Sequence, residues 1–249
     1  MVTFSSSDLR ALVIAAVVLG ILFGYDDQQP TFQLSYWLTN LIIMIVLSFF
    51  SLMLYDAAHK IKAKRAGCES SIHLWSMSRF SYAASSHLRG PIKSIPLGII
   101  IPLLFLFLTE GVLKVATLTS TSIKTISARR LGKEFRRATE LEEAQIACAG
   151  PLMSLFIAFL AKIIIPFFPF MQQVMAINLY LAFFNMLPLP TLDGTRVFFG
   201  SPLMFSFFFT MALLAFFFLR AVAPLTTFLF ALVVALGVLL VHYNNRYIK

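Results

Sequence analysis

Four residues that could bind a metal ion or transfer a proton lie in or beside long apolar stretches of this chain. Tyr55, Asp56 and His59 occur in the segment LYDAAHK, and Asp193 occurs in the segment NMLPLPTLDG. In a helix, Tyr55 and His59 lie one turn apart on one face, with Asp56 about 100° around the axis. Two side chains at this spacing can bind one metal ion, as the two histidines of H-E-x-x-H bind zinc. Ionisable side chains at membrane depth are costly and usually functional, so these residues are the first candidates for chemistry.

Each candidate also has a simpler interpretation. Asp193 follows Pro188 and Pro190, so it could cap the next helix or pair with Arg196 near the membrane surface. His59 could be a histidine at the end of a helix, at the level of the lipid head groups. The presence of both sites in one chain favours the functional interpretation.

The composition indicates that these residues are positioned inside a lipid bilayer. Hydrophobic residues make up 59% of the 249 residues and charged residues only 12%, whereas a soluble domain is about 25% charged. We therefore expect an integral membrane protein and exclude a cytosolic enzyme and a disordered chain. A disulfide scaffold is excluded as well, because the two cysteines, Cys68 and Cys148, are far apart in the sequence.

Six stretches meet or approach the length of about 20 apolar residues that a transmembrane helix needs. They are 9–24, 36–58, 145–165, 172–190, 203–219 and 221–241. Basic residues follow the second stretch at 60–65, and acidic residues precede it at 26–27. Because basic loops stay in the cytoplasm, the second helix ends there and both termini are cytoplasmic. We expect an all-α, multi-pass protein of the cell membrane with six transmembrane helices.

The apolar stretch 95–118 is the ambiguous one. If it crossed the membrane once, the basic residues at 124–137 would lie outside while those at 60–65 lay inside, against the positive-inside rule. The sequence TEG at 109–111 is a turn signal that follows the β-branched run at 99–101. We therefore expect a re-entrant β-hairpin or loop buried in protein, with a helix as the alternative.

The positive charge is concentrated in one block between the apolar stretches. Residues 60–140 carry 14 of the 20 basic side chains and four acidic ones, and the whole chain has a formal net charge of +9. In a membrane protein such a block marks the cytoplasmic side and contacts with anionic lipids. We expect the lipid bilayer as a partner and no nucleic acid.

Three segments resemble the signatures of the site-2 protease family of intramembrane zinc metalloproteases. They are YDAAHKIKAKRAG at 55–67, AGPLMS at 149–154 and NMLPLPTLDG at 185–194. The family pattern is H-E-x-x-H with a basic A-K-x-x-G stretch, then G-P-x-x-N, then N-x-x-P-x-x-x-L-D-G. The segments around Leu74-Trp75 and at 95–98 also resemble archaeal-type members. The resemblance covers residues 40–200, and its last motif is matched without a gap.

The resemblance implies a three-helix core around a zinc site within the membrane. In the family, the two histidines and the aspartate of L-D-G bind zinc, and the glutamate is the general base that helps to cleave a transmembrane polypeptide. Carried over, His59 and Asp193 are the surviving ligands and Tyr55 stands at the lost ligand position. Asp56 stands at the position of the base. The family's asparagine in G-P-x-x-N is Ser154 here.

Other positions of the resemblance point to a cavity for a substrate or partner. Asn185 and Pro188 are retained from the family pattern, and Gly150 and Ser154 belong to the second motif. Gly150, Ser154 and Ala158 also form a stripe of small residues, which lets a transmembrane helix approach its neighbour closely. We expect the first four of these residues to line the cavity.

The implied core suggests three regions. Residues 1–35 form the first transmembrane span and an outer loop. Residues 36–200 form the core, with spans 36–58, 145–165 and 172–190 and the basic cytoplasmic segment 60–140 that carries the re-entrant hairpin. Residues 201–249 form two further spans and a cytoplasmic tail.

The altered first motif predicts an impaired zinc site. Catalytic zinc keeps three protein ligands, and a phenol with a pKa near 10 is a poor substitute. Asp56 is also one methylene shorter than glutamate, which draws a base away from its water. We expect zinc to be absent or weakly bound and the chain to be a pseudoprotease that binds or scaffolds a membrane protein. An active zinc-dependent intramembrane protease is the alternative, and a transporter is less favoured because no inverted repeat is visible.

Overall fold

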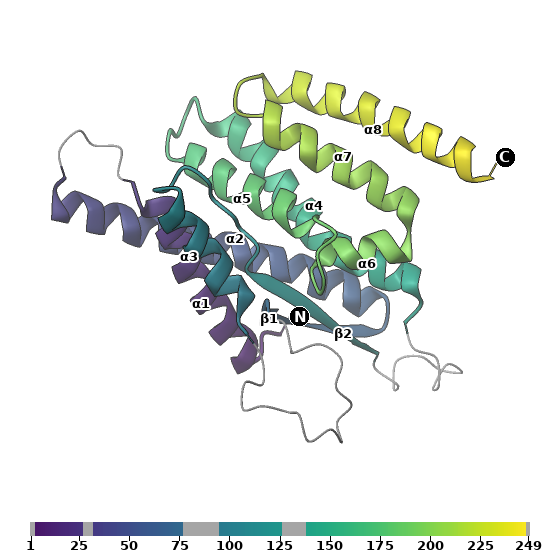
Figure 1. The fold of residues 1–249 in the computed structure, drawn as a ribbon, viewed down its shortest axis with the longest axis horizontal. Coiled ribbons are helices and arrows are strands. Elements are labelled where there is room, and N and C mark those ends of the chain that lie inside the picture. Colours follow the sequence, from purple (N-terminus) through teal and green to yellow (C-terminus); the bar gives the residue numbers. More distant parts are fainter. Residues whose placement is uncertain (1–2, 27–31, 77–94, 126–137, 248–249) are drawn as a thin grey trace.

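A computed structural model describes residues 3–26, 32–76, 95–125 and 138–247 of the chain (Figure 1). Parts of the predicted basic segment, at 77–94 and 126–137, lie outside the described residues. The described part contains helices α1 (Ser6–Gly24), α2 (Leu34–Arg65), α3 (Leu97–Leu108), α4 (Glu140–Ile164), α5 (Met171–Asn185), α6 (Asp193–Gly200), α7 (Pro202–Phe218) and α8 (Pro224–Tyr247), and strands β1 (Cys68–Leu74) and β2 (Thr119–Thr125).

Four helices are long and apolar enough to cross a membrane. They are α1, α2, α4 and the part Pro224–Asn245 of α8, whereas α3 and α7 are shorter apolar helices. The protein is thus mostly helical and carries several membrane-spanning candidates, as the composition predicts. The predicted span at 172–190 corresponds to a helix of only 15 residues, α5, which ends at Asn185 ahead of Pro188.

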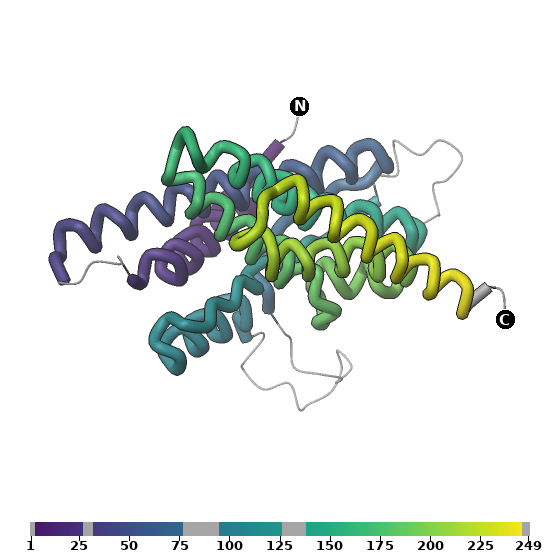
Figure 2. The backbone as a smooth tube through the Cα atoms, turned by 90° about the horizontal axis from the view of Figure 1, so that it is seen from above, coloured from purple at the N-terminus to yellow at the C-terminus, as the bar shows by residue number. Residues whose placement is uncertain are grey.

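The helices are arranged in layers. Figure 1 shows α8 and α7 on one side, α4 and α5 in the middle, and α2 and α1 on the other side. One buried apolar cluster joins α1, α2, α3 and α5, and a second joins α4, α5, α7 and α8. Figure 2 shows α3 beside α1 and apart from α7 and α8. The middle helices α4 and α5 therefore link the two halves of the core.

The ends of the long helices follow from their capping residues. Ser5 and Asp8 form a reciprocal capping box at the start of α1. Thr139 and Glu142 form another at the start of α4. These side chains satisfy backbone N–H groups that have no partner within the helix. At its other end, α2 extends through the basic run to Arg65, so the helix is longer than the predicted apolar span 36–58.

A two-stranded antiparallel sheet accompanies the helices, which the prediction of an all-α protein does not include. β1 pairs with β2 from Cys68 opposite Thr125 to Leu74 opposite Thr119. The pairing continues past the strands, because Trp75 N donates to Leu118 O over 2.8 Å. The strands are more than 40 residues apart in sequence, so neither segment alone indicates its partner.

The prediction of a β-hairpin at 95–118 is wrong, because its first arm is the helix α3. Leu97–Leu108 is helical despite the β-branched run and Pro102, since propensity is a weak guide that tertiary packing overrides. The turn at 109–111 is confirmed, with positive φ angles at Glu110 and Gly111. The chain then returns, and Leu118 O lies directly against Gly98 at the start of α3.

Candidate functional site

Tyr55 and His59 lie on one face of α2, as their spacing predicts. Both side chains are fully buried. Their ring centroids are 4.9 Å apart with an edge-to-face orientation. The Tyr55 hydroxyl and the His59 imidazole therefore lie close together inside the bundle.

The loop between α5 and α6 brings Asp193 to this face of α2. α5 ends at Asn185, and the segment 186–192 leads to Asp193, the first residue of α6. The Tyr55 hydroxyl donates a hydrogen bond to Asp193 Oδ2. His59 Nε2 lies 3.2 Å from the same oxygen, without the alignment of a hydrogen bond. We call these three residues, Tyr55, His59 and Asp193, the buried trio.

Asp193 does not cap α6 with its side chain, which was the simpler interpretation from the sequence. The residue at the N-cap is Leu192, and no side-chain capping bond is formed there. Gly194 follows Asp193 and stands so close to Met186 O and Leu187 O that a Cβ would not fit. The glycine thus allows the chain to turn tightly and to present the carboxylate of Asp193 to α2.

α4 fixes the orientation of the His59 ring. His59 Nδ1 lies 2.7 Å from the backbone oxygen of Ile146. A carbonyl oxygen can only accept a hydrogen bond, so Nδ1 carries the proton. Nε2, the nitrogen that faces Asp193, is therefore the one whose protonation can change.

Gly150 allows α4 to approach the buried trio. A Cβ at this position would lie 2.7 Å from Tyr55 Cζ and would also overlap the ring of His59. Ser154 follows one helical turn later and is buried, with no hydrogen-bond partner for Oγ among the described residues. Gly150, one of the small residues predicted to permit close packing, thus does so against the candidate site itself.

The substitution Gly150→Ala is expected to lower the free energy of unfolding by about 1–3 kcal/mol, because either a ring or α4 must move. Gly237→Ala in α8 is a matched control, since a Cβ there meets nothing within 4 Å. We expect Gly237→Ala to be neutral or to stabilise by about 0.5–1 kcal/mol through helix propensity. Unfolding of both variants in the same detergent measures the difference. Equal effects of the two substitutions would contradict the tight contact.

Asp56 does not join the buried trio. Its Oδ2 lies 3.5 Å from Lys60 Nζ, and Lys60 Nζ lies 2.8 Å from Asp8 Oδ2 and 3.0 Å from Ser70 O. Lys60 therefore stands between two buried carboxylates and ties α2 to α1 and β1. Lys60 and Asp8 were not among the residues predicted to have a role at the site. The spacing of Asp56 and Lys60, four residues apart on one helix, was an available signal.

Two of the predicted cavity residues have other local roles. Asn185 is buried, and its Nδ2 donates to Leu181 O over 3.1 Å within α5. Pro188 is exposed in the loop that leads to Asp193. Among the described residues, no hydrogen bond joins either one to the buried trio. Pro188 acts instead by stopping α5 early enough for the loop to form.

Trp75 contacts the loop 186–192 and was not among the predicted site residues. Its Nε1 donates to Pro190 O over 3.0 Å. Its backbone oxygen accepts from Gly98 N over 2.8 Å. Trp75 therefore connects the end of β1, the start of α3 and the loop that carries Asp193.

Several buried polar atoms of the predicted site residues have no hydrogen-bond partner among the described residues. They are His59 Nε2, Asp193 Oδ1, Ser154 Oγ and Asn185 Oδ1. Buried polar atoms are rarely left without partners in folded proteins, so such groups point to a bound water, ion or ligand. In the buried trio, a polar guest of this kind would contact His59 Nε2 and Asp193 Oδ1.

The residues present do not match the ligand set of a catalytic zinc ion. Among the described residues, no three histidine, cysteine, aspartate or glutamate side chains gather in one place. The trio offers one imidazole, one carboxylate and a phenol whose proton is already donated to that carboxylate. Catalytic zinc keeps three protein ligands and an open position. The trio can exchange protons and hydrogen bonds.

Comparison with known proteins gives no relative from which to transfer a function. The chain matches no protein-family model, and it has no significant similarity to a curated protein or to a solved structure.

Proposed function

We propose that this chain is a membrane-embedded pseudoprotease of the site-2 protease family, in which a hydrogen-bonded trio replaces the zinc centre. It acts as a binding or scaffold subunit that holds a transmembrane helix or a membrane-protein partner. The observation that carries the proposal is the hydrogen bond from the Tyr55 hydroxyl to Asp193. A proton donor occupies the place where the family has a metal ligand, and it satisfies the buried carboxylate directly.

The buried carboxylate of Asp193 needs a partner that compensates for its loss of hydration. Asp193 is 1% exposed, and an unpaired carboxylate at that depth is costly. In a metalloprotease the zinc ion compensates for this cost, whereas here the phenol and the neighbouring imidazole can do so. The fold can therefore be stable without a metal. Asp56, at the position of the base, faces Lys60 instead and is compensated separately.

The proposed setting is the cell membrane with both termini in the cytoplasm. The long apolar helices support membrane insertion. The basic residues at the end of α2, Lys62, Lys64 and Arg65, support a cytoplasmic location for that end. The lipid bilayer is then the first partner of the chain, and the polypeptide that it holds is the second.

An active zinc-dependent intramembrane protease is the alternative, and one observation favours it. His59 Nε2 and Asp193 Oδ1 are both buried without a hydrogen-bond partner among the described residues. These two atoms are of the type that bind zinc. A third ligand from a water or a partner protein would then complete the site.

Zinc content distinguishes the two proposals. We expect the purified chain to contain well under one zinc per molecule, to keep its melting temperature after chelation and to leave a reporter transmembrane helix uncleaved. The variant Asp193→Ala is measured alongside it. About one zinc per chain that is lost in Asp193→Ala, together with zinc-dependent cleavage, would establish the protease instead.

A further inference from the structure

A cavity lies at the end of the bundle that carries the C-terminal end of α1 and the connections between α4 and α5 and between α7 and α8. Its volume is about 540 Å³. Figure 1 places these connections at the opposite end from the C-terminus of α2. The cavity is lined by side chains from α1, α2, α4, α5 and the return arm after α3. It is therefore separate from the buried trio.

Basic side chains dominate the charge of this cavity. Lys114, Lys162 and Arg220 line it, and Asp26 is the one carboxylate among the described residues that line it. The three basic residues lie far apart in sequence, on the return arm, on α4 and in the turn after α7. Only the fold gathers them, and among the described lining residues the three cations outnumber the carboxylate of Asp26.

The positions of the three cations are held by contacts other than salt bridges. Lys114 Nζ lies 5.2 Å from the centroid of the Phe23 ring. The Arg220 guanidinium lies 5.1 Å from the centroid of the Tyr180 ring. Lys162 Nζ donates to the backbone oxygen of Arg220 over 2.9 Å. In the part of the chain that the structure describes, none of the three lies within 4.0 Å of a carboxylate oxygen.

Among the described residues, no carboxylate forms a salt bridge with these three cations. Burial lowers the pKa of Lys114, and the nearby Arg220 lowers it further, while Asp26 acts in the opposite direction. Like charges at close range repel, so a protein that brings them together needs a compensating group. An anion bound between them would supply that compensation and would raise the pKa of Lys114.

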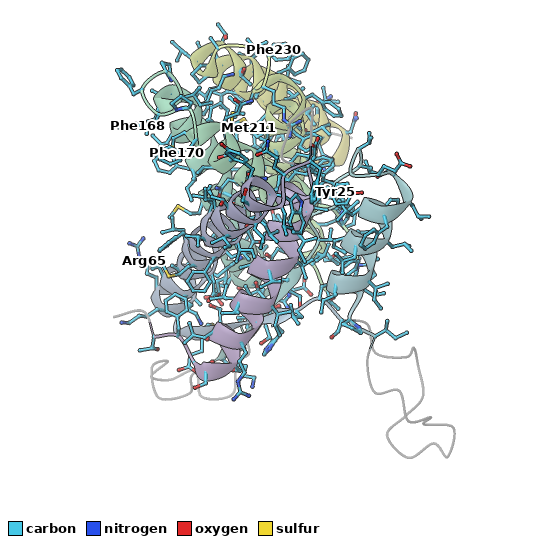
Figure 3. The ribbon with its side chains drawn as sticks, turned by 90° about the vertical axis from the view of Figure 1, so that its left-hand side faces the viewer. Tyr25, Arg65, Phe168, Phe170, Met211 and Phe230 are labelled. Carbon is cyan, nitrogen blue, oxygen red and sulfur yellow. The ribbon has the colours of Figure 1, made fainter. Side chains whose placement is uncertain are left out.

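The surroundings of the cavity fit the boundary of a membrane. Phe167, Phe168 and Phe170 are exposed in the connection between α4 and α5, next to the lining residues Gln172 and Gln173 (Figure 3). Exposed phenylalanines suit contact with lipid chains, and the adjacent amide and cationic groups suit contact with head groups, so the two together fit this boundary. The amides can donate hydrogen bonds to an oxyanion.

We infer that this cavity binds a phosphate group, presented by the head group of an anionic phospholipid or by a soluble phosphate compound. The guanidinium of Arg220 can donate two parallel hydrogen bonds to phosphate oxygens, and the two ammonium groups add charge. Basic pockets between transmembrane helices bind lipid head groups in this way. The inference does not depend on the proposed function, because no residue of the buried trio lines the cavity.

The test uses the full chain in detergent and native mass spectrometry. Phosphatidylglycerol and phosphatidylcholine are titrated separately, and inorganic phosphate and a soluble phosphodiester are tested as competitors. We compare the unmutated chain with the double variant Lys114→Gln/Arg220→Gln. The matched control is Lys62→Gln/Arg65→Gln, which removes two charges at the other end of α2. Melting temperatures check that each variant is folded, and Arg220→Lys serves as a milder change that keeps the charge.

A lipid ligand would be supported if the chain binds phosphatidylglycerol saturably and in preference to phosphatidylcholine. The affinity should then be about thirtyfold weaker in the cavity variant and unchanged in the control. Stronger binding of the soluble phosphodiester, with the same loss in the variant, would support a soluble ligand. Equal binding by the cavity variant, the control and the unmutated chain overturns the inference. If the double variant does not fold, the same comparison is made with Arg220→Gln alone, and an unchanged affinity then overturns it.

Discussion

Replacing Tyr55 by histidine is expected to give the chain a zinc site. In Tyr55→His, the new imidazole occupies the position one turn before His59 and opposite Asp193, so three ordinary zinc ligands converge. Loss of a single group that only holds a zinc ligand in place changes zinc affinity about 10–100-fold. Gain of a direct ligand should therefore strengthen binding by at least ~100-fold. Zinc bound per chain after equilibration and desalting measures the effect, and we expect about one equivalent.

Two further variants test the cause of that gain. Tyr55→Phe removes the hydroxyl but adds no ligand, so it should bind no more zinc than the unmutated chain. The double variant Tyr55→His/Asp193→Ala should lose the gained zinc, because only two ligands remain. The interpretation of Tyr55 as the lost ligand position is wrong if Tyr55→His stays metal-free while it is folded. Equal zinc binding by Tyr55→Phe would argue against it as well.

The members of the buried trio were predictable, whereas their hydrogen bonding was not. Helical spacing alone puts Tyr55 and His59 on one face, and Asp193 stands out as a charge beside an apolar helix. The contact between Asp193 and α2 depends on where α5 stops and on the path of the loop 186–192. A distance of 138 residues in sequence separates Tyr55 from its partner, and no local pattern encodes such a contact.

In the fold as well, some features can be predicted from the local sequence, whereas others depend on contacts between distant segments. Apolar length identifies α1, α2, α4 and α8 as membrane-spanning candidates, because the bilayer thickness imposes that length. The turn at 109–111 is likewise local, since glycine readily adopts positive φ. The pairing of β1 with β2 and the helical state of α3 are settled by contacts between distant segments. The role of Trp75 belongs to this second group.

The contact between Lys60 and its two carboxylates is expected to be the strongest single determinant of stability outside the apolar core. Asp8 is 2% exposed and Asp56 is fully buried, so Lys60→Met leaves two carboxylates without their cation. Breaking a buried ion pair by removing one partner costs about 3–5 kcal/mol. We expect a loss of this size in the free energy of unfolding, measured in detergent. Arg65→Met, an exposed position on the same helix, should change it by less than about 0.5 kcal/mol.

A double-mutant cycle separates the ion pair from a loss of packing. Asp8→Asn removes one of the two charges that Lys60 compensates and leaves the size of the side chain unchanged. If the charge is the cause, Asp8→Asn should cost less in the Lys60→Met background than in the unmutated chain, with a coupling of about 1–3 kcal/mol. A coupling of zero would show that the charge of Asp8 is not the cause, and would leave Asp56, the hydrogen bond to Ser70 O and the packing of the aliphatic stem. In that event the hydrogen bond from Lys60 Nζ to Ser70 O, and not the charge of Asp8, would be the polar contact to test next.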